Sequence, residues 1–273
     1  MAEDPKIIRL YHYMPAKYAE EFLREDKIKL CDISKSNDLC EFTPKMVEDE
    51  KTVEAYMAAI ISDNVLATFK ASKPPLVLSF STRISSSAMW GHYADTNNGV
   101  CLAFDFPIEN LKVRHGVLTG TVKGFHDILF QKVRYAENRF EMPASKFIHQ
   151  EKMVSEILCS AAAYKALDWE YEKECRIVGF ITKNTENIYA ENEKFYMRNL
   201  RKFLAGVILG PKCDLPDIYI ESILYNLKKE LKPDEVHDGL INGNGIARAC
   251  LDNRKLEISA VGFEDFNFDS IQP

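Results

Sequence analysis

The sequence predicts an α+β fold in which helices flank a mixed, mainly antiparallel sheet. The expected strands and helices alternate irregularly, without the regular repeat that builds a parallel sheet. Residues 112–135 alternate apolar and polar side chains, with Gly120 and Gly124 expected at turns, as in a hairpin or meander. The chain shows no internal repeat, low-complexity linker or break in composition. We therefore expect one domain over residues 1–273, with the motifs in about 7–211 and residues 212–262 completing the fold.

Strands and helices follow from periodicity, turn residues and breakers along the chain. Strands are expected at residues 7–13, 27–31, 76–81, 99–106, 175–181, 203–209 and 256–261, with the fourth ended by Pro107. A helix is expected after Pro15, because proline suits the first turn and apolar residues then recur at helical spacing. Further helices are expected at residues 44–70, 85–92, 144–167 and 215–231.

Composition favours a reducing, cytoplasmic environment and gives no sign of a membrane partner. The 273 residues are 46% hydrophobic, which is ample for a core, and the net charge is −6. That charge argues against strong non-specific binding to nucleic acid or anionic membranes. Seven cysteines occur without a Cys-x-x-Cys pair, and no apolar stretch approaches the ~20 residues of a membrane helix.

The common catalytic and nucleotide-binding motifs are absent from the sequence. It contains no phosphate loop, Gly-x-Gly-x-x-Gly, Gly-x-Ser-x-Gly or His-Glu-x-x-His motif, and no cysteine–histidine pair at zinc spacing. Residues 241–246 carry Gly-x-Gly but lack the third glycine, and their Asn-Gly pairs are typical of turns. Candidate functional residues must therefore come from less familiar segments.

The first such segment is a short strand at residues 10–13. His12 shares one face of this strand with Leu10, while Tyr11 and Tyr13 share the other. A histidine flanked by aromatic residues is either a site residue or a half-buried structural residue. Both interpretations stay open from the sequence.

The second segment, residues 79–95, joins a strand end to an aromatic-rich helix. Ser79 and Ser81 end the strand, and residues 85–87 are three serines that can cap the helix. Helical spacing places Met89, His92 and Tyr93 on one face, with Trp90 beside Tyr93. The alternative is an aromatic helix that serves only the core.

The third segment, residues 168–176, concentrates carboxylates. If it is extended, Glu170, Glu172, Glu174 and Arg176 project from one face. The opposite face then carries Trp169, Tyr171, Lys173 and Cys175. Like charges this close raise one another's pKa unless a cation compensates, and such crowding is typical of functional sites. A solvated strand edge with Glu–Arg pairs is the alternative.

Together these segments resemble the ordered motifs of the bacterial family called domain of unknown function 2971. The matching motifs occupy residues 10–13, 36–42, 79–81, 89–95, 99–105, 169–176 and 206–211. Their number and order make the resemblance specific. The family name itself assigns no activity.

A second resemblance, to ADP-ribosyltransferases of the DarT type, concerns the chemistry. A strand histidine, an aromatic-bearing helix and a glutamate opening a late strand occur in the same order. The resemblance implies NAD as substrate, with His12 holding a ribose hydroxyl and Tyr93 or Trp90 stacking on nicotinamide. Glu174, or alternatively Glu172, would be the late-strand glutamate that stabilises positive charge on the ribose. It also implies a fold like that of the ADP-ribosyltransferases and a role in bacterial defence or as a toxin.

The expected site therefore combines two groups of residues. The catalytic candidates are Glu174, Glu172 and His12. The candidates for binding NAD are His12, Tyr13, Ser79, Ser81, Trp90, His92, Tyr93, Asn37, Asp38 and Arg176. No metal is expected in this NAD-consuming transferase or glycohydrolase.

Two other functions stay open from the sequence. Asp38, Glu41, His92 and Glu174 would suit Mg²⁺ or Mn²⁺ in a metal-dependent nuclease or hydrolase. The same site could instead bind a nucleotide or partner without catalysis. The macromolecular acceptor of a transferase, protein or nucleic acid, is not readable. The most basic stretch is either a phosphate-contacting surface or a solvated hairpin face, and contains Lys112, Arg114, Lys123, Lys132 and Arg134.

Overall fold

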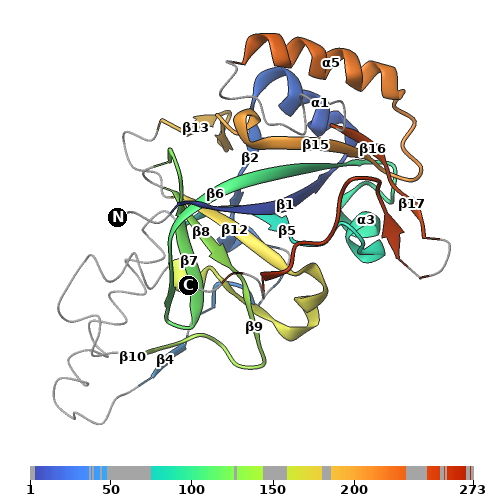
Figure 1. Ribbon diagram of the computed structural model, residues 1–273. Helices are drawn as coiled ribbons and strands as arrows, with labels where there is room; N and C mark the ends of the chain where they lie inside the picture. Colours follow the sequence, from blue (N-terminus) through green and yellow to red (C-terminus); the bar gives the residue numbers. More distant parts are fainter. Residues whose placement is uncertain are drawn as a thin grey trace.

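The structure is a computed structural model of the chain (Figure 1). It describes residues 4–36, 38, 40–43, 45–47, 75–125, 128–143, 159–179, 186–231, 245–252, 255, 257–268 and 271. Its helices are α1 (Ala16–Glu25), α3 (Ser87–Tyr93) and α5 (Asp217–Glu230), with 3₁₀ helices at Ile33–Lys35, Leu167–Glu172 and Arg201–Phe203.

The strands of the main sheet are β1 (Lys6–Met14), β3 (Cys31–Asp32), β5 (Leu76–Ser81), β6 (Val100–Arg114), β7 (Val117–Val122), β8 (Ile128–Lys132), β12 (Glu174–Gly179), β15 (Leu204–Leu209) and β16 (Ile246–Arg248). Smaller sheets contain β2 (Ile28–Lys29), β4 (Lys45–Val47), β9 (Arg134–Ala136), β10 (Glu141–Pro143), β11 (Tyr164–Ala166), β13 (Ile188–Glu191), β14 (Lys194–Met197), β17 (Cys250–Leu251) and β18 (Ile258–Ser259).

Six strands of the main sheet pair in a closed circuit that begins and ends at β1. The order β1-β5-β12-β8-β7-β6 is closed by pairing of β6 with β1, and every one of these pairs is antiparallel. The long strand β6 makes this possible, because β1 pairs along one edge while β15 and β7 share the other. Among the described strands of this sheet, β16 alone adds a parallel pair, with β15. The predicted α+β fold with a mainly antiparallel sheet is confirmed.

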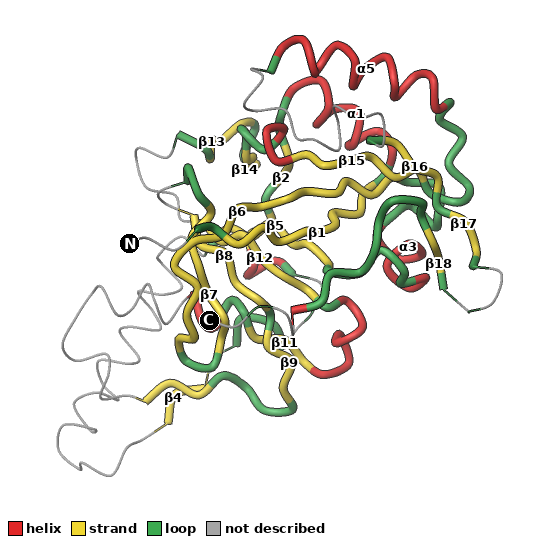
Figure 2. The backbone as a smooth tube through the Cα atoms, viewed as in Figure 1, coloured by secondary structure: helices red, strands yellow, loops and turns green. Residues whose placement is uncertain are grey.

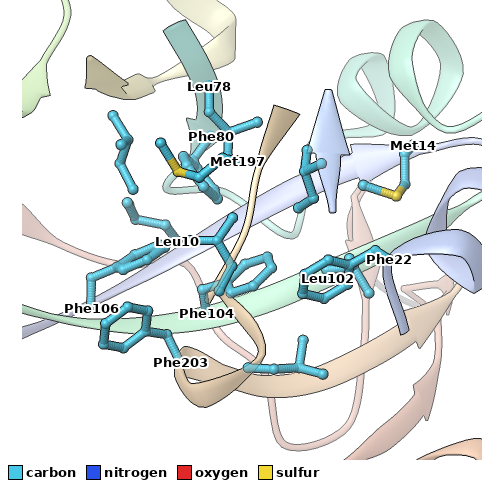
Figure 3. Close-up of a cluster of buried hydrophobic side chains, with 14 of the residues drawn as sticks. Leu10, Met14, Phe22, Leu78, Phe80, Leu102, Phe104, Phe106, Met197 and Phe203 are labelled. Atoms are coloured by element: carbon cyan, nitrogen blue, oxygen red, sulfur yellow. The ribbon is translucent and has the colours of Figure 1, made fainter. Parts of the chain in front are cut away.

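The main hydrophobic core lies on one face of this sheet, under helices α1 and α5 (Figures 1 and 2). Phenylalanines of β5 and β6 pack edge to face or stacked there, and Phe22 of α1 joins them (Figure 3). Two smaller apolar clusters lie on the opposite face. One contains Tyr11, Tyr13 and Trp90, and the other contains Ile33, Val77 and Val178. The candidate site lies between these two clusters.

Many predicted elements are confirmed with shifted boundaries. The predicted strands at residues 7–13, 76–81, 175–181 and 203–209 correspond to β1, β5, β12 and β15. The predicted helices at 85–92 and 215–231 correspond to α3 and α5, and Ser86 caps α3 by accepting from the Met89 N–H. The predicted meander is formed by β6, β7 and β8.

Several local predictions are wrong. Pro107 does not end its strand, because β6 continues to Arg114 while Pro107 pairs with Ile7. Gly120 lies inside β7, where a side chain would collide with Ile108, and only Gly124, with φ 82°, lies at a turn. The turn between β6 and β7 instead uses His115 and Gly116, both with positive φ.

Two predicted helices also differ where the structure describes them. Residues 45–47 form strand β4 rather than helix, and the rest of the predicted 44–70 helix lies outside the described residues. Of the predicted 144–167 helix, residues 144–158 are also outside them, residues 159–161 are helical as predicted, and Tyr164–Ala166 forms β11 instead. Pairing of β11 with β9 outweighs the helical periodicity there. The hairpin of β13 and β14 was not predicted. The single domain stays a prediction.

Candidate functional site

A cavity of about 330 Å³ opens on the face of the sheet opposite the main core. Its walls come from β1, β3, β5 and β12, the segment after β3, helix α3, strand β11 and the 3₁₀ helix Leu167–Glu172. The lining residues are Tyr11, His12, Tyr13, Cys31, Ile33, Lys35, Ser36, Glu41, Val77, Ser79, Phe80, Ser81, Met89, Tyr93, Lys165, Glu172, Glu174 and Arg176. A cavity of this volume is at the small end of the usual range for small-molecule sites.

His12 lies where strands β1 and β5 separate. These strands share one registered pair, Tyr11 with Ser81. Beyond it, the His12 Nδ1 lies 2.7 Å from the backbone oxygen of Ser79, so the imidazole bridges the strands in place of backbone pairing. A carbonyl accepts only, so Nδ1 carries the proton and a neutral ring leaves Nε2 as an acceptor. Burial lowers the pKa of His12, which favours this neutral form.

Helix α3 divides its aromatic residues between the cavity and the core. Met89 and Tyr93 line the cavity, as their predicted shared face requires. Trp90 is fully buried, packs edge to face on Tyr13 and donates from Nε1 to the Ile84 oxygen at 2.9 Å. His92 is exposed and contacts the Tyr171 hydroxyl at 3.2 Å. The structure thus brings Tyr93 to the cavity and leaves Trp90 and His92 outside its lining.

The carboxylate-rich segment is not one extended strand, so its glutamates do not all project from one face. Residues Leu167–Glu172 form a 3₁₀ helix, Lys173 adopts a left-handed conformation with φ 45°, and β12 begins at Glu174. The helix separates carboxylates that a strand would crowd onto one face. Glu170 points to solvent and pairs with Lys173 at 2.7 Å, whereas Glu172 lines the cavity. Glu174 and Arg176 do share a face of β12, as predicted.

Five buried ionisable groups form a continuous cluster beside the cavity. Lys165 Nζ lies 2.6 Å from Glu172 Oε2 and 3.3 Å from Glu174 Oε2. Arg176 holds Glu174 through two bonds, Nε to Oε1 at 2.8 Å and Nη2 to Oε2 at 2.9 Å, and its Nη2 also contacts Glu41. Three buried carboxylates therefore share two buried cations.

The two cavity glutamates have different electrostatic environments. Burial, reinforced by the neighbouring Glu174, raises the pKa of Glu172 despite its bond to Lys165. Burial would also raise the pKa of Glu174, but Arg176 and Lys165 outweigh it and hold the pKa at about 2. Glu174 is therefore an ionised partner of Arg176 at neutral pH. Glu172 also accepts a hydrogen bond from the Tyr93 hydroxyl. Its raised pKa makes it the better suited of the two carboxylates to proton transfer.

Some of the remaining predicted site residues line the cavity and others lie outside its lining. Tyr13, Ser79, Ser81 and Arg176 line the cavity, and the Ser81 hydroxyl donates to the Glu172 backbone oxygen at 2.6 Å. Asp38 is buried next to this region but is not in the cavity lining, and its Oδ1 accepts from the Cys40 N–H at 2.9 Å. Asn37 lies outside the described residues.

Lys165 is the central residue that the sequence did not reveal. It was expected in the predicted 144–167 helix, among apolar positions. In the structure, pairing of β11 with β9 places it across from Tyr135, and its ammonium group lies 4.8 Å from the Trp169 ring centroid. Tyr135 also supports the site, because its hydroxyl accepts from the Glu174 N–H at 2.7 Å. A lone lysine in an apolar run is a weak signal that points to a buried ion pair.

The residues of the metal hypothesis do not come together. Glu41 and Glu174 both bind the Arg176 guanidinium, which lies between them, while His92 is outside the cavity lining. Within the described residues, no group of three or more histidine, cysteine, aspartate or glutamate side chains is placed to hold a metal ion. None of the described helices has the length and apolar character needed to span a bilayer.

The chain thus has an α+β fold with a buried ionic cluster at a cavity, formed largely by the central part of the sequence. Residues 89–177 match the model of the family described as "Protein of unknown function (DUF2971)". This match supports the family resemblance that the motifs predicted, and it includes Tyr93, Lys165, Glu172, Glu174 and Arg176. No curated protein and no solved structure matches the chain. The resemblance to ADP-ribosyltransferases stays a prediction.

Proposed function

We propose that the chain is an NAD-consuming enzyme that cleaves the bond between nicotinamide and ribose, as an ADP-ribosyltransferase or NAD glycohydrolase does. The observation that carries this proposal is the placement of Glu172 at the cavity, with a raised pKa and a hydrogen bond from Tyr93. His12 lines the same cavity as a neutral imidazole. Together these groups supply a carboxylate, an aromatic surface and a hydrogen-bonding ring within one small site.

Each group has a defined role in the proposed reaction. The C1′–N bond breaks with its electron pair leaving on nicotinamide, and positive charge develops on the ribose. The Glu172 carboxylate stabilises that charge and accepts the proton of the attacking water or acceptor hydroxyl. Tyr93 holds the nicotinamide ring, and His12 Nε2 accepts from a ribose hydroxyl. With water as nucleophile, the products are nicotinamide, ADP-ribose and one proton.

Glu174 has a positioning role in this scheme, although its place in the strand resembles that of the late-strand glutamate. Both of its oxygens are held by cations, and its pKa of about 2 keeps it unprotonated. It fixes Lys165 and Arg176, and Lys165 in turn orients Glu172. The active carboxylate is therefore Glu172, the alternative offered by the sequence.

Nicotinamide release tests the proposal directly. Purified chain is incubated with NAD, alone and with protein or nucleic-acid acceptors, and nicotinamide is quantified by chromatography. Release that disappears in Glu172→Gln and persists in Glu170→Gln supports the assignment. Glu170 is a matched control because it lies in the same 3₁₀ helix with its side chain 52% exposed. The absence of release with every acceptor, together with no NAD-dependent rise in melting temperature, would overturn the proposal.

A second candidate, nucleotide binding without catalysis, is favoured by a separate observation. Both oxygens of Glu172 already have partners, Tyr93 on Oε1 and Lys165 on Oε2. A carboxylate held this firmly can serve recognition alone. The same assay separates the two functions, because a binding module shows an NAD-dependent thermal shift without nicotinamide release. A role in bacterial defence stays a prediction under either function.

A further inference from the structure

Charge in the cavity is unbalanced at its buried end. Glu41, Glu172 and Glu174 are each at most 7% exposed, and the cations buried with them are Lys165 and Arg176. Arg176 forms ion pairs with Glu41 and Glu174. Lys165 forms ion pairs with Glu172 and Glu174. When all three carboxylates are ionised, the buried cations among the described residues leave one negative charge uncompensated. A buried charge of this kind is costly unless a counter-charge is supplied.

The same cavity offers little to a ligand phosphate. Among its described lining residues, the cations are Lys35, Lys165 and Arg176. Each already lies beside a carboxylate: Lys35 is 3.6 Å from Asp32, Lys165 is 2.6 Å from Glu172, and Arg176 is 2.8 Å from Glu174. Phosphate binding normally depends on cations or backbone amides that are free to face it. The charge pattern therefore opposes anions and favours a cation.

Aromatic rings complete a surface suited to an organic cation. Tyr11, Tyr13, Phe80 and Tyr93 all line the cavity. The face of an aromatic ring attracts cations, and the attraction is strongest where water is excluded. A volume of about 330 Å³ accommodates one ring and an attached sugar more readily than a complete dinucleotide. Size, charge and lining thus agree on one kind of ligand.

We infer that the cavity selects the positively charged nicotinamide riboside end of NAD⁺ by its charge, with Glu172 as the counter-ion, and leaves the diphosphate outside. This inference rests on the proposed function for the identity of the ligand. It adds that the oxidised, cationic form of the ring is the form recognised. The reduced dinucleotide carries the same phosphates but a neutral ring, so it is the matched ligand that isolates the charge.

Binding constants for NAD⁺ and NADH test the inference. They are measured by calorimetry on the full chain in the cold, where turnover is slow. We expect NAD⁺ to bind about tenfold more tightly than NADH, the scale of one desolvated cation–aromatic and charge interaction. Glu172→Gln should bring the ratio close to one, and Glu170→Gln should leave it unchanged. Equal binding of the two dinucleotides by the wild-type chain would overturn the inference.

Two fragments provide a second measurement that needs no variant. Nicotinamide riboside has the charge without the diphosphate, and ADP-ribose has the diphosphate without the charge. The dissociation constant of nicotinamide riboside, measured by displacement of NAD⁺, should lie within about tenfold of that of NAD⁺. ADP-ribose should bind more weakly than nicotinamide riboside. The reverse order would place recognition on the phosphates. Nicotinamide release with an NAD⁺/NADH ratio of one would reject this inference alone, and charge selectivity without release would reject only the proposed catalysis.

Discussion

Glu172 and Glu174 share the ammonium group of Lys165, yet their pKa values move in opposite directions. The difference comes from Arg176, which binds Glu174 through two nitrogens and leaves Glu172 with Lys165 and Tyr93. Two carboxyl groups with separated pKa values are typical of sites that use one for chemistry and the other for structure. The following predictions depend on this division.

Glu172→Gln should lower nicotinamide release by roughly two to four orders of magnitude, the scale of one electrostatic or acid–base group. Folding should be retained at neutral pH, because the raised pKa means that the charge of this side chain is less favourable in the folded chain than in the unfolded chain. The measurement is kcat/KM for NAD, with the melting temperature as the folding check. Activity within threefold of wild type would assign the chemistry elsewhere.

Arg176→Met should destabilise the fold by about 3–5 kcal/mol, because it leaves Glu41 and Glu174 buried without their cation. The midpoint of urea unfolding reports this loss. Lys173→Met is the control, since that lysine pairs with Glu170 at 2.7 Å on the surface, where one pair contributes about 1 kcal/mol or less. Similar losses in both variants would show that the buried cluster is not a stability determinant.

Glu174 should make folding sensitive to acid. Its folded pKa of about 2 lies below the ordinary 4.5, so the stabilisation is complete above about pH 4.5 and is lost as pH falls toward 2. The shift corresponds to about 3 kcal/mol. The stability difference between wild type and Glu174→Gln should therefore shrink over this window, measured by urea unfolding at a series of pH values. A difference that is independent of pH would contradict the assignment.

Trp90 and Tyr93 should respond differently to substitution, because only Tyr93 lines the cavity. Trp90→Phe should lower stability by about 1–3 kcal/mol through lost packing and the lost bond to Ile84, with NAD affinity of the folded protein unchanged. Tyr93→Leu should weaken NAD binding about tenfold. Calorimetry and thermal melting separate the effects, and weaker binding by Trp90→Phe alone would reverse the roles.

His12→Ala should weaken NAD binding about tenfold, because it removes the ring that faces the cavity and bridges β1 to Ser79. His12→Asn is the companion variant, since its amide can still donate across the gap between the strands. Restored stability without restored affinity in His12→Asn would show that the ring contacts ligand. Full affinity in both variants would make His12 purely structural.

The sequence predicted best where local periodicity and tertiary packing agree. Alternation in β1 placed Tyr11 and Tyr13 together in one apolar cluster, and serine capping located α3. The sequence did not predict the 3₁₀ helix before Glu174, because a Glu-x-Glu pattern suits both an extended strand and a short helix. The positive φ of Lys173, which ends this helix, is visible only in the structure. The sequence did not reveal the role of Lys165, because its position depends on the pairing of β9 with β11. No local sequence pattern encodes that pairing.

The boundary between β1 and β5 has a mechanical consequence. Elsewhere in the closed circuit, neighbouring strands are joined by several registered pairs, whereas here Tyr11 and Ser81 are joined by one and His12 by a side-chain bond. The circuit therefore has a seam, and the cavity lies along it. Both strands keep other partners, β1 along β6 and β5 along β12, so this boundary is the part of the circuit least fixed by backbone pairing.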